Sequence, residues 1–135
     1  MQSTNQPVLV SQKMLWTGRI MSALPVLMLT FSGVMKLLNP PGLADGFNHL
    51  GVPVNLALGL GILELSCTII YVIPRTAVLG AILLTGYLGG AVLTHLRVGD
   101  PFLAPVLPGV LLWGGLYLRD PWLRTLIPLR RNQMS

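Results

Sequence analysis

The most informative position in this sequence is an acidic residue in the middle of an apolar segment. Glu64 lies in the run GILELS, residues 61–66. An ionisable side chain at the centre of a bilayer costs about 2.5 to 3.5 kcal/mol on insertion scales, so it usually faces neighbouring helices and finds a partner or a proton. Glu64 is therefore either a site that binds a ligand or handles protons, or a structural group that orders helices through hydrogen bonds.

The helix face that carries Glu64 is small or polar, which suits contact with other helices rather than with lipid. Its members are Ala57, Leu60, Gly61, Cys67, Thr68 and Tyr71. Counting back from a tight turn at Pro74 and Arg75 places Thr85 opposite Glu64 and Tyr87 within one turn, close enough to donate a hydrogen bond. In this count no cation reaches the depth of Glu64. Because removal from water favours the neutral carboxyl group, we predict that Glu64 is largely protonated at neutral pH.

Other polar residues gather near the outer ends of the apolar segments. Lys36 and His95 lie at a similar depth near the outer interface, and His49 joins them if the first outer connection folds back over the helices. With Asp45 and Asp100 as counter-charges, they could line a polar pocket open to the outer side. No HxxxH or HxxE spacing occurs, so we predict no metal site.

Three further features carry weaker signals. Arg19, one turn inside the first apolar segment, either reaches the headgroups with its long side chain or faces inward to pair with a carbonyl or an anion. Cys67 is the only cysteine, which excludes an internal disulfide and dithiol chemistry, and its apolar surroundings favour a packing role. Gly86 and Gly90 form a GxxxG spacing, which permits close helix contact within the chain or between copies.

The composition determines what kind of protein must position these residues. Of 135 residues, 53% are hydrophobic and 10% are charged, and the mean hydropathy is +0.71. Soluble domains carry about 25% charged residues, and disordered chains are poor in apolar residues. The sequence therefore predicts an integral membrane protein that contacts the lipid bilayer.

Four apolar stretches are long enough to cross a membrane as helices, at roughly 20 residues per span. They cover residues 16–38, 53–73, 76–96 and 102–118, with a basic tail over residues 119–135 and a short interfacial helix over residues 44–50. The connections are short and rich in proline and glycine, which favours antiparallel neighbours. We predict an all-α, antiparallel up-down four-helix bundle forming a single domain over residues 1–135.

The distribution of Lys and Arg predicts the orientation. Seven basic residues fall on one side: Lys13, Arg19, Arg75, Arg119, Arg124, Arg130 and Arg131. Only Lys36 and Arg97 fall on the other, so both termini should be cytoplasmic. The net charge of +5 follows from this membrane topology, and we predict no binding of nucleic acid.

The assembled pattern resembles the DoxX-like family of small four-helix membrane proteins. The motifs that carry the resemblance are FSGVMKL at 31–37, LGVP at 50–53, GILEL at 61–65 and HLR at 95–97. The resemblance implies a multi-pass protein of the bacterial inner membrane, with Lys36, Glu64 and His95 as its characteristic polar set. Some relatives are subunits of a thiosulfate to quinone oxidoreductase, others associate with redox-defence enzymes or act as assembly factors. The lack of a cysteine pair argues against a thiol relay in this chain.

Three functions remain open. The first is a redox-linked subunit that binds a quinone or a similar small apolar ligand, with Glu64, Lys36, His95, Tyr87 and Arg19 as candidate residues; electrons would come from a partner protein or a bound cofactor. The second is a scaffold or assembly partner of membrane or redox proteins, or a homo-oligomer, without enzyme activity. The third, a transporter or proton pathway, has few polar residues that continue from the centre to the cytoplasmic side, namely Arg19 and Tyr71.

Overall fold

The computed structural model describes residues 11–126, and every regular element in that range is a helix. The four long helices are α1 (Gln12–Leu38), α3 (Ala57–Val72), α4 (Ala77–Arg97) and α5 (Leu103–Arg119). The short ones are α2 (Leu43–Leu50), the 3-10 turns η1 (Val54–Leu56) and η2 (Pro74–Thr76), and α6 (Pro121–Leu126). The predicted tail extends beyond this range, so Pro128, Arg130 and Arg131 lie outside the described residues.

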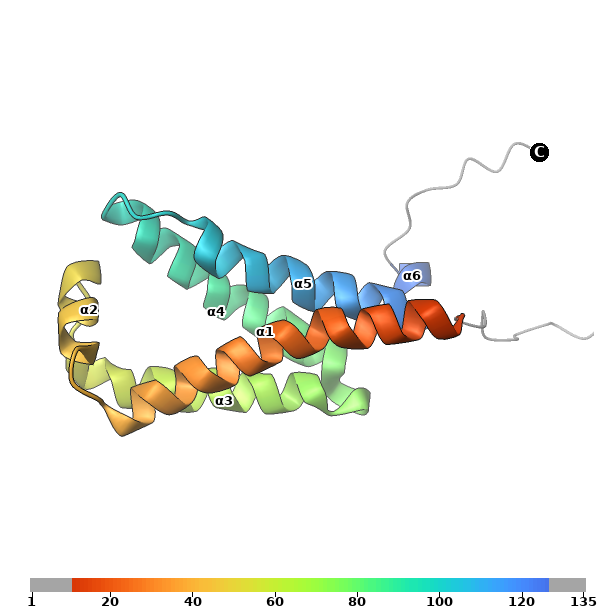
Figure 1. The fold of residues 1–135 in the computed structure, drawn as a ribbon, viewed down its shortest axis with the longest axis horizontal. Helices are drawn as coiled ribbons and strands as arrows, with labels where there is room; N and C mark the ends of the chain where they lie inside the picture. Colours follow the sequence, from red (N-terminus) through yellow and green to blue (C-terminus); the bar gives the residue numbers. More distant parts are fainter. Residues whose placement is uncertain (1–10, 127–135) are drawn as a thin grey trace, which may run out of the picture.

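The four long helices pack around one another, and each contacts two of the others. Helix α1 packs against α3 and α5, and α4 packs against the same two helices. Figure 1 shows that α1 and α3 diverge from α4 and α5 toward one end, and that α2 lies across this wider end. We call the opposite end, where the four long helices stay close together, the closed end (Figure 1). The wide end and the closed end therefore offer different environments to the side chains that lie between the helices.

Helix length and exposed apolar side chains are those of a membrane protein. Three stretches, Gln12–Leu38, Val54–Val72 and Pro74–Arg97, are long and apolar enough to span a bilayer, and Leu103–Arg119 is a shorter apolar helix. Large apolar side chains on the outside, such as Leu27 and Phe31, are about two-thirds exposed. In lipid, exposed apolar side chains carry no penalty. A helix also pairs its own backbone N–H and C=O groups there, so it needs no water.

The observed helices follow the predicted segments closely, with two additions at the ends. Helix α1 begins at Gln12 because the Ser11 side chain accepts a hydrogen bond from the Met14 N–H at 3.3 Å, as an N-cap residue does. Helix α6 in the tail was not predicted. Asp120 caps it by accepting from the N–H groups of Trp122 and Leu123 at 2.9 and 3.3 Å, and Pro121 occupies its first position. The predicted short helix over residues 44–50 is confirmed by α2.

The closed end is held by small residues and by buried hydrogen bonds. A Cβ atom added to Gly18 of α1 would lie 2.7 Å from the carbonyl oxygen of Gly115 on α5, so these backbones need glycine. The Tyr71 hydroxyl donates to the carbonyl of Leu112 at 2.7 Å and accepts from the Ser22 hydroxyl at 2.8 Å. Helices α1, α3 and α5 are thereby joined through one side chain.

The predicted GxxxG contact on α4 is not used inside the described chain. A Cβ added to Gly86 or Gly90 meets no atom within 4 Å. The close approach between α3 and α4 occurs instead at Gly80, where a Cβ would run into the backbone of Tyr71. Gly90 lines an open space, which forms part of the site described next.

Candidate functional site

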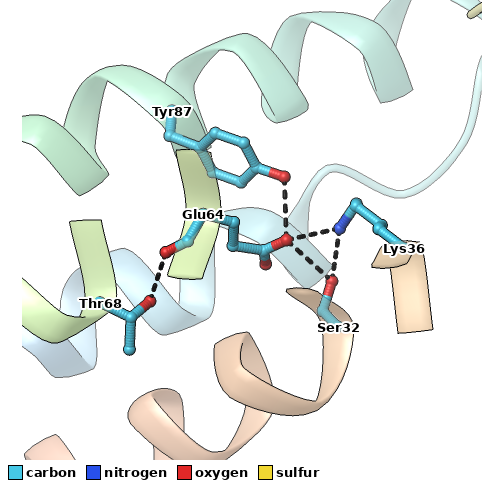
Figure 2. A network of polar contacts seen from close by, with 5 residues as sticks. All are labelled: Ser32, Lys36, Glu64, Thr68 and Tyr87. Atoms are coloured by element: carbon cyan, nitrogen blue, oxygen red, sulfur yellow. Dashed lines mark hydrogen bonds and ion pairs between the residues drawn. The ribbon is translucent and has the colours of Figure 1, made fainter. Parts of the chain in front are cut away.

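Glu64 is the centre of a polar network at the junction of three helices (Figure 2). Glu64 is buried, with 1% of the surface of the whole residue exposed. One carboxylate oxygen, Oε2, accepts hydrogen bonds from Lys36 Nζ at 2.6 Å, Tyr87 Oη at 3.0 Å and Ser32 Oγ at 3.3 Å. The carboxylate from α3 is therefore held by donors from α1 and α4.

The spacing on α1 explains how two of these donors reach the same atom. Ser32 and Lys36 are four residues apart, so both lie on one face of the helix. Lys36 Nζ also donates to Ser32 Oγ at 2.6 Å, which leaves the Ser32 hydroxyl proton free to point at Glu64. One turn further along α3, the Thr68 hydroxyl donates to the backbone carbonyl of Glu64 at 2.7 Å. The network fixes both the side chain and the backbone of Glu64.

The prediction that no cation reaches Glu64 is wrong. It compared only the depth at which each residue is attached to its helix, whereas Lys36 carries its charge at the end of a four-carbon chain that extends inward along α1. The pair forms a salt bridge in which the Lys36 and Glu64 side chains are 16% and 2% exposed. The premise of the prediction that Glu64 is protonated, the absence of a nearby cation, therefore does not hold.

Of the two residues that depth counting placed near Glu64, only Tyr87 forms a hydrogen bond with it. Tyr87 donates to the carboxylate as predicted. Thr85 does not contact Glu64, because its hydroxyl donates to the carbonyl of Ala81 at 2.7 Å and accepts from Trp113 Nε1 at 2.7 Å. The two residues lie two apart on α4, so a helix turns their side chains to different sides.

An apolar cavity of about 530 Å³ lies beside this network, between the diverging helices and beneath α2. Its apolar wall includes Met28, Phe47, Leu60, Leu88, Pro105 and Pro108. Its polar wall is made by the network residues Ser32, Lys36, Glu64 and Tyr87, together with Thr94 and His95. A mostly apolar space with a few convergent polar groups is the usual form of a small-molecule site.

His95 belongs to the cavity wall but not to the network around Glu64. Its Nδ1 atom lies 2.7 Å from the carbonyl oxygen of Ala91 and donates to it, since a carbonyl can only accept. In a neutral ring the other nitrogen, Nε2, is then an acceptor. The predicted set of Lys36, Glu64 and His95 is brought to one cavity, with His95 in a separate position on its wall.

Helix α2 lies over the wide end and is tied to α4 and its following turn. The Arg97 guanidinium donates to the carbonyl of Leu50 at 2.9 Å, and His49 Nε2 lies 2.8 Å from Asp100 Oδ2. The connection between α1 and α3 therefore folds back over the helices, which was the condition for His49 to join the polar pocket, but His49 does not line the cavity. The expected pocket differs in its charges, because Asp100 pairs with His49 and Glu64 is the counter-charge of Lys36, while Asp45 is exposed.

Arg19 is not brought to this site. It is exposed near the start of α1, and its guanidinium carbon lies 5.2 Å from the centre of the Trp16 ring. The alternative in which it faces inward therefore finds no support in the structure. Among residues 11–126, no group of three or more His, Cys, Asp or Glu side chains could hold a metal ion.

Ser32 and the cavity itself are the parts of the site that the sequence reasoning missed. The signal for Ser32 was its position four residues before Lys36 in FSGVMK, which puts a hydroxyl and an ammonium on one helix face. The cavity has no comparable signal, since it arises from the divergence of two helix pairs.

Comparison with known proteins identifies the family of this chain. A family model described as the DoxX-like family matches residues 20–115, a range that contains Ser32, Lys36, Glu64, Tyr87 and His95. No curated protein and no solved structure matches the chain.

Proposed function

This chain belongs to the DoxX-like family, and we propose that it binds a small apolar molecule with a polar head, of the quinone type, in the cavity beside Glu64. The observation that carries this proposal is the position of the Lys36–Glu64 pair on the wall of an apolar space. An ion pair between helices needs no cavity beside it if its role is only to hold them together.

The size and surroundings of the cavity suit a ligand that is dissolved in lipid. Its volume of about 530 Å³ falls in the usual range for small-molecule sites, roughly 300 to 1,000 Å³. The cavity is open to the surface, and two of its wall residues, Met28 on α1 and Ala104 on α5, are themselves exposed. An apolar molecule could enter from the bilayer without crossing water.

In this proposal the chain serves as the binding subunit of a redox-linked membrane assembly. Lys36 and Ser32 would orient the polar head, and Glu64 would hold or release a proton close to it. Proton transfer at a site withdrawn from water needs such a group in place. Electrons would come from a partner protein or another bound group.

We further propose that the four long helices span the inner membrane as an antiparallel bundle, in a single domain over residues 1–135 with both termini cytoplasmic. The described charges support this orientation, because Arg75, Arg119 and Arg124 lie at the end opposite α2, and basic side chains favour the cytoplasmic side. The wide end, with the cavity and α2, would then face outward.

Two neighbouring glycines on α4 give a matched test of ligand binding. Gly90 lines the cavity, Gly89 does not, and an added Cβ meets no atom within 4 Å at either position. Binding of decylubiquinone to protein in lipid nanodiscs would be measured for the wild type, Gly90→Leu and Gly89→Leu. We expect Gly90→Leu to lose binding and Gly89→Leu to keep it. Equal binding by all three proteins would reject the cavity as the site.

The alternative is a scaffold or assembly partner without enzyme activity. It is favoured by the way the network joins α1, α3 and α4 through one carboxylate. A scaffold would tolerate Glu64→Gln, because an amide keeps hydrogen bonds, whereas a proton-handling site would fail while the protein still folds and inserts. Partner co-purification unchanged by Glu64→Gln, without ligand binding by the wild type, would favour the scaffold.

A further inference from the structure

The two oxygens of the Glu64 carboxylate have unequal surroundings. Oε2 accepts all three side-chain hydrogen bonds, whereas Oε1 has no partner among the residues that the structure describes (Figure 2). Within residues 11–126, the one fully buried side-chain nitrogen or oxygen without a partner is Nε of Arg119. Oε1 is therefore not sealed inside the protein, and the open space that Glu64 lines is the cavity.

An unpaired carboxylate oxygen in an apolar cavity favours ligands that can donate a hydrogen bond to it. A ligand that fills the cavity displaces water from Oε1, and an acceptor that loses water without gaining a hydrogen bond is costly. A ligand whose polar atoms only accept would leave Oε1 in that state. A ligand that brings an N–H or O–H group would satisfy it with a charge-assisted hydrogen bond, the stronger kind.

The charge of the site argues for a neutral donor. Lys36 and Glu64 compensate each other at 2.6 Å, so a bound anion or cation would add an unbalanced charge to a space with little water. The Lys36 ammonium has three protons, of which Glu64 and Ser32 take two. A remaining donor beside a free acceptor matches a hydroxyl group, which donates once and also accepts.

We propose, on the basis of the proposed function above, that the ligand of this cavity carries a hydroxyl group that donates to Oε1 of Glu64. The class is a neutral apolar phenol, hydroquinone or long-chain alcohol, which binds more tightly than a molecule of similar shape with carbonyl or ether oxygens alone. For a quinone-type ligand, the reduced form with its O–H groups would be held more tightly than the oxidised form.

A matched pair of stable probes tests this inference without redox chemistry. Para-pentylphenol and its methyl ether, para-pentylanisole, have nearly the same shape, but only the phenol donates. Radiolabelled binding of each probe to the wild type in nanodiscs would be measured, with Gly90→Leu subtracted to remove partition into lipid. We expect the phenol to bind at least about tenfold more tightly than the ether, the difference that one hydrogen bond to a charged group makes.

The double variant Lys36→Met/Glu64→Leu removes both charged groups and leaves the cavity in place. It should bind the two probes with similar affinity. Equal affinity of the wild type for phenol and ether, or binding of decylubiquinone without binding of the phenol, would overturn the hydroxyl inference while leaving the proposed function intact. If neither probe nor decylubiquinone distinguishes the wild type from Gly90→Leu, the proposed function fails together with the inference.

Discussion

The Nζ atom of Lys36 lies 2.6 Å from Oε2 of Glu64, and this pair joins the C-terminal part of α1 to the middle of α3. Both side chains are largely buried, so each charge is stabilised mainly by the other. A buried pair of this kind adds little net stability relative to apolar residues, but either partner alone is strongly unfavourable. This asymmetry yields a direct test of the pair.

Replacing one partner of the pair should destabilise the protein much more than replacing both. We expect Lys36→Met or Glu64→Leu alone to lower the free energy of unfolding by about 3 to 5 kcal/mol, since each leaves a buried charge unpaired. The double variant Lys36→Met/Glu64→Leu should recover most of that loss. Chemical denaturation in a mild detergent measures all three variants, and additive losses would show that the two side chains do not interact.

The Tyr87 hydroxyl should stabilise the protein through its hydrogen bond to Glu64. Tyr87→Phe removes the 3.0 Å hydrogen bond to Glu64 but keeps the ring, and we expect a loss of about 1 to 3 kcal/mol in stability. Tyr117→Phe is the control, because the Tyr117 hydroxyl makes no hydrogen bond within residues 11–126. Similar losses in the two variants would mean that the Tyr87 contact with Glu64 does not contribute.

Arg97 should hold α2 in place over the cavity. Its guanidinium donates to the backbone carbonyls of Leu50 and Gly51, which end α2. In Arg97→Met these bonds are lost, so amide hydrogen exchange in α2 should become several-fold faster. Arg75→Met serves as the control, since Arg75 is exposed in the turn at the opposite end. Unchanged exchange in Arg97→Met would contradict the role of Arg97.

The sequence was sufficient to predict the positions of the four long helices, apart from the first turn of α1, which begins at Gln12. Apolar runs are interrupted by strong breakers, such as Asn39-Pro40 after α1 and Pro74-Arg75 between α3 and α4, and these local signals depend little on tertiary structure. Helix α6 also had a local signal, the capping pair Asp120-Pro121, which was overlooked because the tail was interpreted only by its charge.

The salt bridge and the cavity could not be predicted in the same way. Counting residues from a turn locates Cα atoms, but the Lys36–Glu64 contact depends on where a long side chain ends. The cavity depends on how far α1 and α3 diverge from α4 and α5, which is a property of packing between helices (Figure 1). The sequence singled out Glu64, which is the centre of the polar network, but predicted no cation beside it.

The proposed orientation predicts which loops face the outside of the cell. In a Cys67→Ala background, Asp45→Cys on α2 and Arg75→Cys in η2 introduce exposed thiols at opposite ends of the helices. A membrane-impermeant maleimide added to intact cells should label Asp45→Cys, and should label Arg75→Cys only after the membrane is opened. The reverse pattern would place both termini outside.

The most direct test of the central claim is native mass spectrometry of the gently solubilised protein, with the wild type compared with Gly90→Leu and Gly89→Leu. We predict a small apolar molecule bound to the wild type and to Gly89→Leu, and no such molecule on Gly90→Leu, whose new side chain occupies the cavity. The same molecule on all three proteins, or on none of them even after incubation with decylubiquinone or para-pentylphenol, would contradict a binding site beside Glu64.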